Sequence, residues 1–351
     1  PESRFVKAAY VSGDATQVDR VSHRLAAYID DSDYAQAAHS NGLDNSIFNR
    51  LQVMAVESTR QALASLKISV AERNTAVILG CGWLDEQSIL VGFYEDAERI
   101  QAYLKKHGAS QDQQRVVNAF FDRLKDRLQA YDDAIFSTSV IAQIRQTFAV
   151  SGEGFMVDAA CASSLAAMQV AIKKLQSGAC DVVISGGVDA YLSPELQQVF
   201  ARTQTLATEG CWPFDARSDG LLQGEGAGIV VLQRLQDARR DGHPIEAVIK
   251  GVGATSNGHV DSLFASNRTA QVRAIRQAMV NYAAREDNAL PWVYDYIECH
   301  GTGTQVGDRT EIEALEDVLS TQKPTEPVPI GSLKALIGHT KSAAGVSSVL
   351  K

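Results

Sequence analysis

The sequence lacks the long apolar run that a membrane-spanning helix needs. No stretch of about 18 apolar residues occurs in the 351 residues, which excludes a transmembrane helix. The first residues, Pro1–Phe5, contain no apolar signal-peptide core either. The five cysteines form no CxxC pair and no zinc spacing, and an odd number cannot all pair in disulfides. These absences favour a reducing, cytoplasmic location.

Runs of lysine and arginine are also missing, and the formal net charge is -9. We therefore expect no binding to nucleic acid or to anionic membranes. A hydrophobic content of 45% and a charged content of 21% are ordinary for a globular enzyme. The length suffices for one large or two medium domains with a sizeable core.

Apolar runs and helical periodicities alternate along the chain, which predicts an α/β architecture with internal duplication. Strand-like runs occupy 74–82, 155–157, 181–187, 226–232, 245–252 and 292–299. Helical patterns occupy 45–66, 95–106, 112–131, 163–176, 269–285 and 310–320. The pattern restarts near Leu235, so we expect an N-terminal half over 1–235 and a C-terminal half over 236–351.

Cys161 is the most informative residue, because it lies where a short apolar strand meets a long, alanine-rich helix. A thiol at such a turn faces the positive end of the helix dipole and several unpaired backbone N–H groups. Both favour the thiolate, so we expect a lowered pKa and a nucleophilic role for Cys161. A cysteine that only fills the core is the competing interpretation.

Two downstream histidines favour the nucleophilic interpretation. His300 follows a strand-like run and opens a Gly/Thr loop, in the sequence ECHGTGT. His339 follows a second strand-like run and a loop that holds Lys334, in the sequence GSLKALIGHT. Reactive groups collect beyond the carboxyl ends of strands in open α/β sheets. Cys161, His300 and His339 all fall at such ends, so we expect them in one site.

These motifs resemble the three active-site motifs of β-ketoacyl synthases, and they occur in the family's order. They are VDAACASSL over 157–165, ECHGTGT over 298–304 and GSLKALIGHT over 331–340. The intervening segment WPFDARSDGLLQGEGAG, over 212–228, also resembles the family. The resemblance covers most of the chain, clearly from about Val140 onward. It implies a thiolase-type fold, in which two similar halves stack helices between two sheets.

Finer details resemble one subgroup of the family. The sequences AACASS and HTKSAAG, together with the segment 85–134, are similar to iterative synthases of the polyunsaturated-fatty-acid and enediyne type.

Both ends of the chain depart from the family's pattern. The sequence opens beyond the apolar strand with which a ketosynthase normally starts. It also stops before the Gly-Phe-Gly-Gly type loop that supplies a second oxyanion-hole N–H in the family. We therefore expect an incomplete domain that does not catalyse by itself.

The resemblance implies an acyltransferase that performs a decarboxylative Claisen condensation in polyketide or fatty acid biosynthesis. Cys161 would carry the acyl group, with its own backbone N–H as one oxyanion donor. His300 and His339 would donate imidazole N–H groups to the extender thioester as decarboxylation turns it into an enolate. Neutral donors suffice for charge that develops on oxygen, so we expect no metal and no bound cofactor.

Three further residues have roles implied by the resemblance. Lys334 would fix the loop before His339 through a carboxylate and favour loss of the substrate's charged carboxylate. Thr302 and Thr304 would contact the phosphopantetheine arm that an acyl carrier protein delivers. A solvated lysine and ordinary turn threonines are the competing interpretations.

The resemblance further implies a homodimer and neighbouring domains of a multidomain synthase. We place the edge strand of that dimer near 181–187, because an exposed apolar edge would otherwise invite aggregation. Two other functions stay open. A thiolase would need a second cysteine late in the chain, and a chain-length-factor-type partner would lack the nucleophile. The presence of Cys161 argues against the inactive partner.

Overall fold

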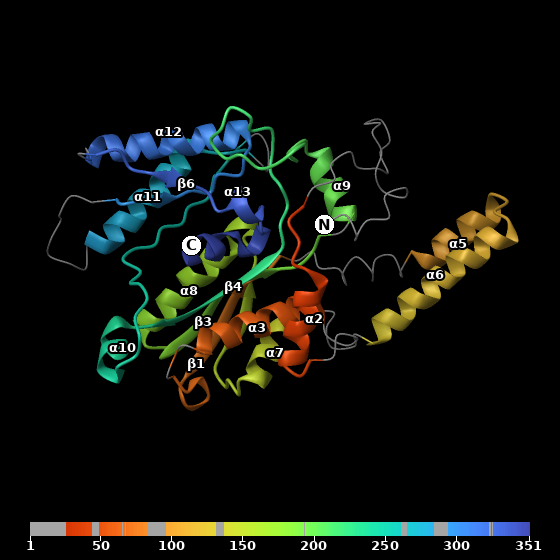
Figure 1. The fold of residues 1–351 in the computed structure, drawn as a ribbon, viewed down its shortest axis with the longest axis horizontal. Helices are drawn as coiled ribbons and strands as arrows, with labels where there is room; N and C mark the ends of the chain where they lie inside the picture. The colour runs from red at the N-terminus through yellow and green to blue at the C-terminus, as the bar shows by residue number, and fades with distance from the viewer. Residues whose placement is uncertain are drawn as a thin grey trace.

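A four-stranded sheet lies at the centre of the N-terminal half (Figure 1). The computed structural model describes residues 26–43, 49–64, 66, 68–82, 96–130, 137–192, 194–260, 265–283, 294–322, 324 and 326–351. The strands are β1 (Thr75–Gly80), β2 (Gly154–Val157), β3 (Val182–Asp189) and β4 (Gly226–Gln233), in the order β2-β1-β3-β4. β1 is parallel to β2 and β3, whereas β3 and β4 are antiparallel. All four strands predicted for this half are confirmed.

Helices cover both faces of this sheet. α3 (Arg50–Ala64) and α7 (Thr138–Thr147) pack on one face, and α8 (Ser163–Ser177) and α14 (Ala344–Leu350) pack on the other (Figure 1). Successive side chains of a strand point to opposite faces. In β1, Val77 and Leu79 therefore join the core of α3 and α7, while Ala76 and Ile78 join the core of α8. The predicted α/β class with stacked layers is confirmed.

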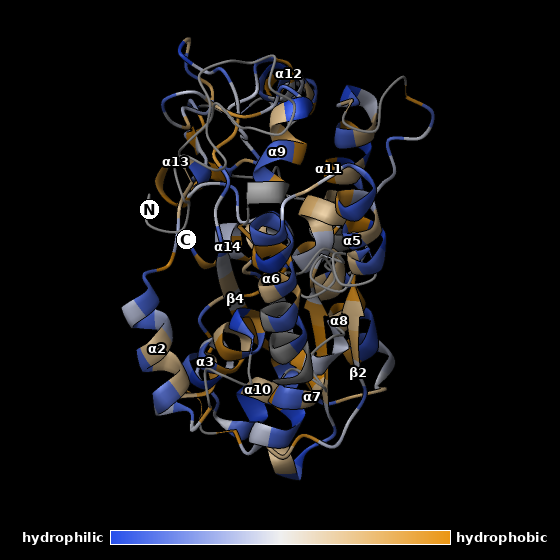
Figure 2. Cartoon of the chain, turned by 90° about the vertical axis from the view of Figure 1, so that its right-hand side faces the viewer, coloured by the Kyte–Doolittle hydropathy of each residue, from blue (hydrophilic) through white to orange (hydrophobic). Residues whose placement is uncertain are grey.

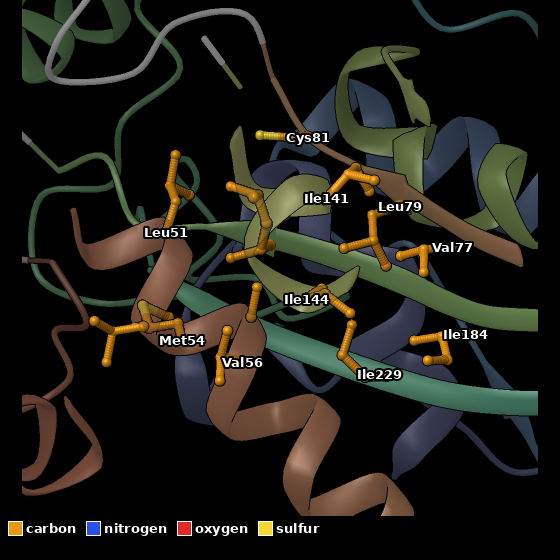
Figure 3. Packing of buried hydrophobic residues seen from close by; sticks show 14 of the residues in the cluster. Leu51, Met54, Val56, Val77, Leu79, Cys81, Ile141, Ile144, Ile184 and Ile229 are labelled. Atoms are coloured by element: carbon orange, nitrogen blue, oxygen red, sulfur yellow. The ribbon is translucent and has the colours of Figure 1, made fainter. Parts of the chain in front are cut away.

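The larger core fills the space between α3, α7 and the sheet (Figure 3). Side chains from five of the elements that contribute to it are Leu51, Met54, Val56, Val77, Leu79, Ile141, Ile144, Ile184 and Ile229. Each such side chain contributes roughly 1.5–3 kcal/mol when it is fully buried. The amphipathic helix predicted over 45–66 is confirmed for 50–64, and residues 45–48 and 65 lie outside the described ranges.

α5 (Ala97–Lys106) and α6 (Gln111–Ala130) form a helix pair that extends away from the sheet (Figure 1). Ala97, Ile100, Val117 and Phe121 pack together between the two helices. Figure 2 shows hydrophilic and hydrophobic positions interleaved along α6, as an amphipathic helix requires. The predicted helices over 95–106 and 112–131 are confirmed, except that residues 95 and 131 lie outside the described ranges.

The C-terminal half contains two long helices and a short parallel sheet. β5 (Ile297–Glu298) pairs with β6 (Ile330–Gly331). α11 (Arg268–Ala283) and α12 (Gln305–Gln322) pack through Val272, Ala314 and Val318. Both predicted helices of this half are confirmed where the structure describes them. The strand predicted over 292–299 is only two residues long here, and residues 292 and 293 are not described.

The strand predicted over 245–252 is wrong. This segment joins no ladder among the described residues, and Ile245, Val248 and Ile249 each keep about two fifths of their surface exposed.

The prediction that 181–187 forms an exposed edge is also wrong, because β3 is an interior strand. β1 lies on one side of it and β4 on the other. Its side chains are apolar because helices cover both faces of the sheet, not because the strand awaits a partner. Among the strands that the structure describes, β2 and β4 lie at the edges of this sheet.

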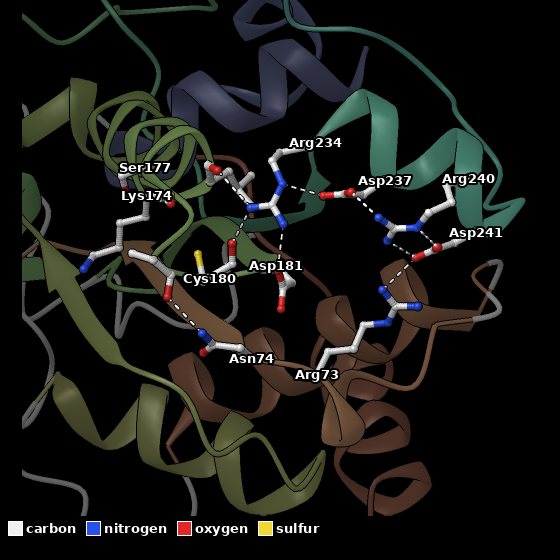
Figure 4. A network of polar contacts seen from close by, with 12 residues as sticks. Arg73, Asn74, Lys174, Ser177, Cys180, Asp181, Arg234, Asp237, Arg240 and Asp241 are labelled. Carbon is white, nitrogen blue, oxygen red and sulfur yellow. Dashed lines mark hydrogen bonds and ion pairs between the residues drawn. The ribbon is translucent and has the colours of Figure 1, made fainter.

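Arg234 joins the end of β4 to α8 and to the start of β3 (Figure 4). Its guanidinium donates to the carbonyl oxygens of Leu175 at 2.9 Å and Cys180 at 2.7 Å, and it pairs with Asp181 at 2.6 Å. It also pairs with Asp237 in α10 (Leu235–Asp241). The expected boundary between the two halves is Leu235, the first residue of α10. Arg234 thus holds α10 against the N-terminal half. The division into two halves stays a prediction.

The remaining helices in the described ranges are short. They are α2 (Asp31–Ser40), α9 (Pro194–Arg202) and α13 (Lys334–Ile337), with the one-turn 3-10 helices η2 (Val70–Glu72), η3 (Ala160–Ala162) and η4 (Lys341–Ala343). Three of these, η3, α13 and η4, place the side chains described next. No helix in the described part of the chain is both long and apolar enough to cross a bilayer.

Candidate active site

Cys161 lies in the turn between β2 and α8, as predicted, inside the one-turn helix η3. The turn contains a left-handed residue, Ala160, with φ of 50°. Two side chains brace it. Asp158 accepts the backbone N–H of Ala160 at 2.9 Å, while the Ser163 hydroxyl donates to the Ala160 carbonyl at 2.6 Å. A left-handed alanine costs roughly 1–3 kcal/mol, so these contacts hold the thiol in a conformation that the chain would otherwise leave.

Two glycines bring the strands close to this turn. A Cβ on Gly80, the last residue of β1, would overlap the backbone of Ser163 and Ser164 at the start of α8. A Cβ on Gly187 in β3 would lie 2.8 Å from the Cβ of Ser164. The absence of side chains at both positions lets the start of α8 rest directly on the sheet.

Cys161 is the only partly exposed cysteine, since the other four are buried. Its pKa lies above that of an ordinary thiol, because burial disfavours the thiolate and the charge of Asp189 adds to this effect. Lys334, Lys341 and the backbone N–H of Cys161 oppose the shift. The expectation of a lowered pKa is therefore wrong: desolvation outweighs the groups that favour the charged form.

His300 follows β5 and opens the loop that leads into α12. The Glu311 carboxylate accepts the backbone N–H of His300 at 2.7 Å and that of Gly301 at 2.8 Å. The Ser332 hydroxyl donates to the Gly301 carbonyl at 2.9 Å. Desolvation by the surrounding chain and the Lys334 ammonium lower the pKa of His300 to about 4, although the residue as a whole is exposed to solvent. At neutral pH its imidazole is uncharged.

His339 forms an isolated parallel β-bridge with Gln223, which lies shortly before β4. Its backbone N–H donates to Leu222 at 2.7 Å, and its carbonyl accepts from Gly224 at 2.9 Å. The ring nitrogen Nδ1 accepts the backbone N–H of Lys341 at 3.0 Å. Because Nδ1 is an acceptor, the neutral ring carries its proton on Nε2. Burial and the charges of His300, Lys334 and Lys341 lower the pKa of His339 well below its usual range.

The two imidazoles face each other edge to face, with ring centroids 5.4 Å apart and an interplanar angle of 85°. Lys334 influences the pKa of both rings and of Cys161, so its charge lies near all three groups. The structure thus brings Cys161, His300, His339 and Lys334 together from turns that are up to 178 residues apart in the chain, as Cys161 and His339 show.

Lys334 is the first residue of the short helix α13 rather than part of a loop, and it is buried. Burial lowers its pKa, while the charges of Cys161, Glu311 and Glu298 raise it. Among the described residues it forms no ion pair with a carboxylate. The expectation that a carboxylate fixes Lys334 is therefore not met, and its ammonium acts on the site through space.

Thr302 and Thr304 lie in the loop after His300, and their hydroxyl oxygens are 2.9 Å apart. Both are partly buried. The Asp308 carboxylate holds the loop between them, because it accepts the backbone N–H of Gly303 at 3.2 Å. Their contact with a substrate arm stays a prediction.

Four residues that position the site were missed from the sequence: Asp189, Asp308, Glu311 and Lys341. Asp308 and Glu311 lie three residues apart in the first turns of α12, directly after the Gly/Thr loop. Carboxylates at a helix start can accept the backbone N–H groups of the preceding loop. That spacing was the available signal. Asp189 and Lys341 pair across 152 positions of the chain, and no local pattern marks such a pair.

Comparison with known families agrees with this geometry. Residues 1–238 match the profile of the β-ketoacyl synthase N-terminal domain, and residues 246–351 match that of the β-ketoacyl synthase C-terminal domain. Among solved structures, an oxazolomycin ketosynthase domain, OzmH KS7, from Streptomyces albus superposes with a TM-score of 0.77 at 23% identity, covering 99% of this chain and 55% of that one. The ketosynthase from module 6 of the Bacillus subtilis bacillaene synthase gives a TM-score of 0.68 at 25% identity, covering 89% and 49%. The thiolase-type fold is confirmed.

Curated relatives are polyketide synthases. Polyketide synthase GfsE of Streptomyces halstedii is 41% identical over 211 residues, which are 60% of this chain and 5% of the relative. A phenolphthiocerol/phthiocerol polyketide synthase polypeptide of Mycobacterium bovis is 42% identical over 202 residues, 57% of this chain and 10% of the relative. The matched region thus spans a tenth or less of the length of either relative.

Proposed function

The chain belongs to the β-ketoacyl synthase family, and we propose that it joins a Cys161-bound acyl group to a decarboxylating malonyl-type extender. The observation that carries this proposal is the pair of neutral imidazoles, His300 and His339, beside the buried ammonium of Lys334. Lowered pKa values keep both rings uncharged at neutral pH, so each ring has one N–H that donates a hydrogen bond and one nitrogen that accepts.

The first stage loads the enzyme. The Cys161 sulfur attacks the carbonyl carbon of an acyl thioester and forms a new carbon–sulfur bond. The bond from that carbon to the carrier's sulfur breaks, and the carrier leaves as a thiol with the proton that Cys161 has lost. Because the new bond is again a thioester, the transfer is close to reversible. The Lys334 ammonium stabilises the transient thiolate, which is needed here because burial raises the Cys161 pKa.

The second stage forms the carbon–carbon bond. The extender's carbonyl oxygen accepts hydrogen bonds from the imidazole N–H groups, carbon dioxide leaves, and the electron pair becomes an enolate. The enolate carbon attacks the acyl carbon on Cys161, and the sulfur departs as the thiolate. For His339 the donor is Nε2, since Lys341 occupies Nδ1.

The partners follow from the same chemistry. We propose that an acyl carrier protein delivers both thioesters on a phosphopantetheine arm that contacts Thr302 and Thr304, and that the domain binds no cofactor or metal of its own. The multidomain relatives support further synthase domains in the same polypeptide. We also propose a cytoplasmic location and a homodimer. The similarity to synthases of the polyunsaturated-fatty-acid and enediyne type stays a prediction.

The alternatives are less well supported. A chain-length-factor-type partner lacks the nucleophile, whereas Cys161 is present and partly exposed. A thiolase needs a second cysteine as a base, and the four other cysteines are buried, with burial raising the pKa of Cys180, Cys211 and Cys299.

The two stages can be separated by substitution. We expect Cys161→Ala to lose condensation but retain decarboxylation of a malonyl-carrier thioester. His300→Ala and His339→Ala should load an acyl group onto Cys161 but decarboxylate on the order of a hundredfold more slowly. Mass spectrometry of the carrier and of the protein scores both stages. If the histidine variants decarboxylate normally and fail to load, the histidines are bases for the thiol and this assignment is wrong.

A further inference from the structure

We propose that the ion pair between Asp189 and Lys341 is a positioning device for His339. The pair holds residue 341 in a left-handed backbone conformation, and this conformation presents the Lys341 N–H to the imidazole of His339. The catalytic consequence rests on the function proposed above, but the structural role does not.

The ion pair is built into the interior. The Lys341 ammonium lies 2.8 Å from Oδ1 of Asp189, and the two side chains are only 14% and 10% exposed. The hydroxyl of Ser342 donates to the other oxygen, Oδ2, at 2.9 Å. A buried charge that loses its partner is strongly destabilising, so each side chain constrains where the other can lie.

The ammonium also reaches the segment that holds His339. It donates to the carbonyl of Gly224 at 2.8 Å, and the N–H of Gly224 donates to the carbonyl of His339 at 2.9 Å. Lys341 therefore connects the end of β3, through Asp189, with the start of β4 and with the backbone of His339. The end of β3 and the residues before β4 are thus both tied to the segment that carries His339.

The backbone of Lys341 explains why such an anchor is needed. Its φ is 45°, a left-handed conformation that residues with a side chain rarely adopt. In this conformation its N–H points at Nδ1 of His339, 3.0 Å away. His339 is held by its backbone bonds to Leu222 and Gly224, and Ser342 is held by its bond to the Val188 carbonyl. A change of φ at residue 341 must therefore be compensated by a turn of the peptide between residues 340 and 341, which would carry the N–H away from the imidazole. The imidazole could then place its proton on either nitrogen.

The charges of the pair oppose each other at Cys161, whereas at His339 the charge of Lys341 also lowers the pKa of the imidazole. Asp189 raises the pKa of Cys161 and Lys341 lowers it, so the two charges oppose each other at the nucleophile. Removal of both charges should therefore change the Cys161 pKa less than removal of either charge alone.

Three variants of Lys341 separate backbone conformation from charge. Lys341→Met keeps the aliphatic stem and removes the ammonium. Lys341→Gly also removes the ammonium, but glycine adopts the left-handed conformation freely. Lys341→Arg keeps the charge and serves as the conservative control. The tautomer of His339 is measured by long-range ¹H–¹⁵N correlation on protein labelled with ¹⁵N-histidine, with His339→Gln used to identify its signals.

We expect the wild type, Lys341→Arg and Lys341→Gly to show the pattern of a proton on Nε2. Lys341→Met should show a mixture of tautomers, and its malonyl decarboxylation should fall about tenfold, with Lys341→Gly within a few-fold of wild type. Near-ultraviolet circular dichroism checks that each variant is folded. A variant that fails this check is replaced by Asp189→Asn, which neutralises the same pair from β3 and should shift the tautomer in the same direction.

Two results would overturn the inference. One is an unchanged tautomer in folded Lys341→Met or Asp189→Asn. The other is an equal loss in Lys341→Gly and Lys341→Met, which would show that the charge itself acts. Absence of decarboxylation by the complete wild-type ketosynthase domain would contradict the proposed function alone, because the tautomer is read without any substrate.

Discussion

The carboxylate of Glu311 lies 2.7 Å from the backbone nitrogen of His300 and accepts its hydrogen bond. The other carboxylate oxygen holds the next peptide, so one side chain from α12 fixes the start of the loop that carries the histidine. The position of this histidine therefore depends on a residue that need not touch the substrate.

We expect Glu311→Ala to slow decarboxylation more than it slows acyl loading of Cys161, because it leaves two backbone N–H groups of the histidine loop without their acceptor. Water can replace the acceptor at the exposed His300 N–H but less readily at the part-buried Gly301 N–H, so the thermal midpoint should also fall, by the loss of about one buried hydrogen bond, about 1 kcal/mol. Glu313→Ala is the matched control, since its carboxylate lies on the same helix but pairs with the exposed Arg268 at 3.3 Å. Equal effects of the two variants would refute a specific role for Glu311.

Iodoacetamide should modify Cys161 ahead of the other cysteines, because it alone is partly exposed and burial raises the pKa of Cys299 to about 12. The raised pKa of Cys161 means that little thiolate exists at neutral pH. The alkylation rate should therefore climb as pH rises, with a midpoint above that of a free thiol.

Lys334→Met should move this midpoint to still higher pH, since it removes the largest influence that favours the thiolate. Lys173→Met, at an exposed position of α8, is the control and should leave the midpoint unchanged. Rates measured by intact-protein mass spectrometry across pH decide the matter. A midpoint that does not move in Lys334→Met would show that its charge is screened from the sulfur.

The homodimer is expected to form along β2, one of the two edges of the four-stranded sheet. The carbonyls of Glu153 and Val157 accept hydrogen bonds from the β1 side. Because the backbone groups of successive residues in a strand point alternately to the two sides, the N–H of Met156 points to the open edge. Met156→Pro removes that donor while leaving the bonds to β1 in place. Sedimentation should show a monomer for this variant and a dimer for the wild type, and a wild-type monomer would contradict the proposed dimer.

Gly80→Ala should destabilise the protein by about 1–3 kcal/mol, because the added methyl would overlap the backbone at the start of α8. The loading of Cys161 should fall as well, since that backbone carries the turn. Gly82→Ala is the control, as its nearest neighbour would be 4.0 Å away. Denaturant unfolding measures the stability of both variants and mass spectrometry their loading, and similar losses in the two would mean that the close approach at Gly80 is unimportant.

The sequence by itself determined the segments that form elements and the turns that carry the chemistry. Strands such as 75–80 and 226–233 are largely apolar runs, and the turn of Cys161 is marked by the strand before it and the helix after it. These are local patterns, because backbone hydrogen bonding and side-chain periodicity within one element depend on neighbours in the chain.

Only the tertiary structure decided which strands have partners and how each site group is solvated. The segment 245–252 has the apolar pattern of a strand but is not assigned as one in the structure, and β3 lies inside the sheet rather than at the predicted edge. The Cys161 pKa rises because distant segments bury the thiol more strongly than Lys334 compensates. Strand pairing, desolvation and the contact between Asp189 and Lys341 all depend on residues far apart in the chain, and local patterns carry no information about those distances.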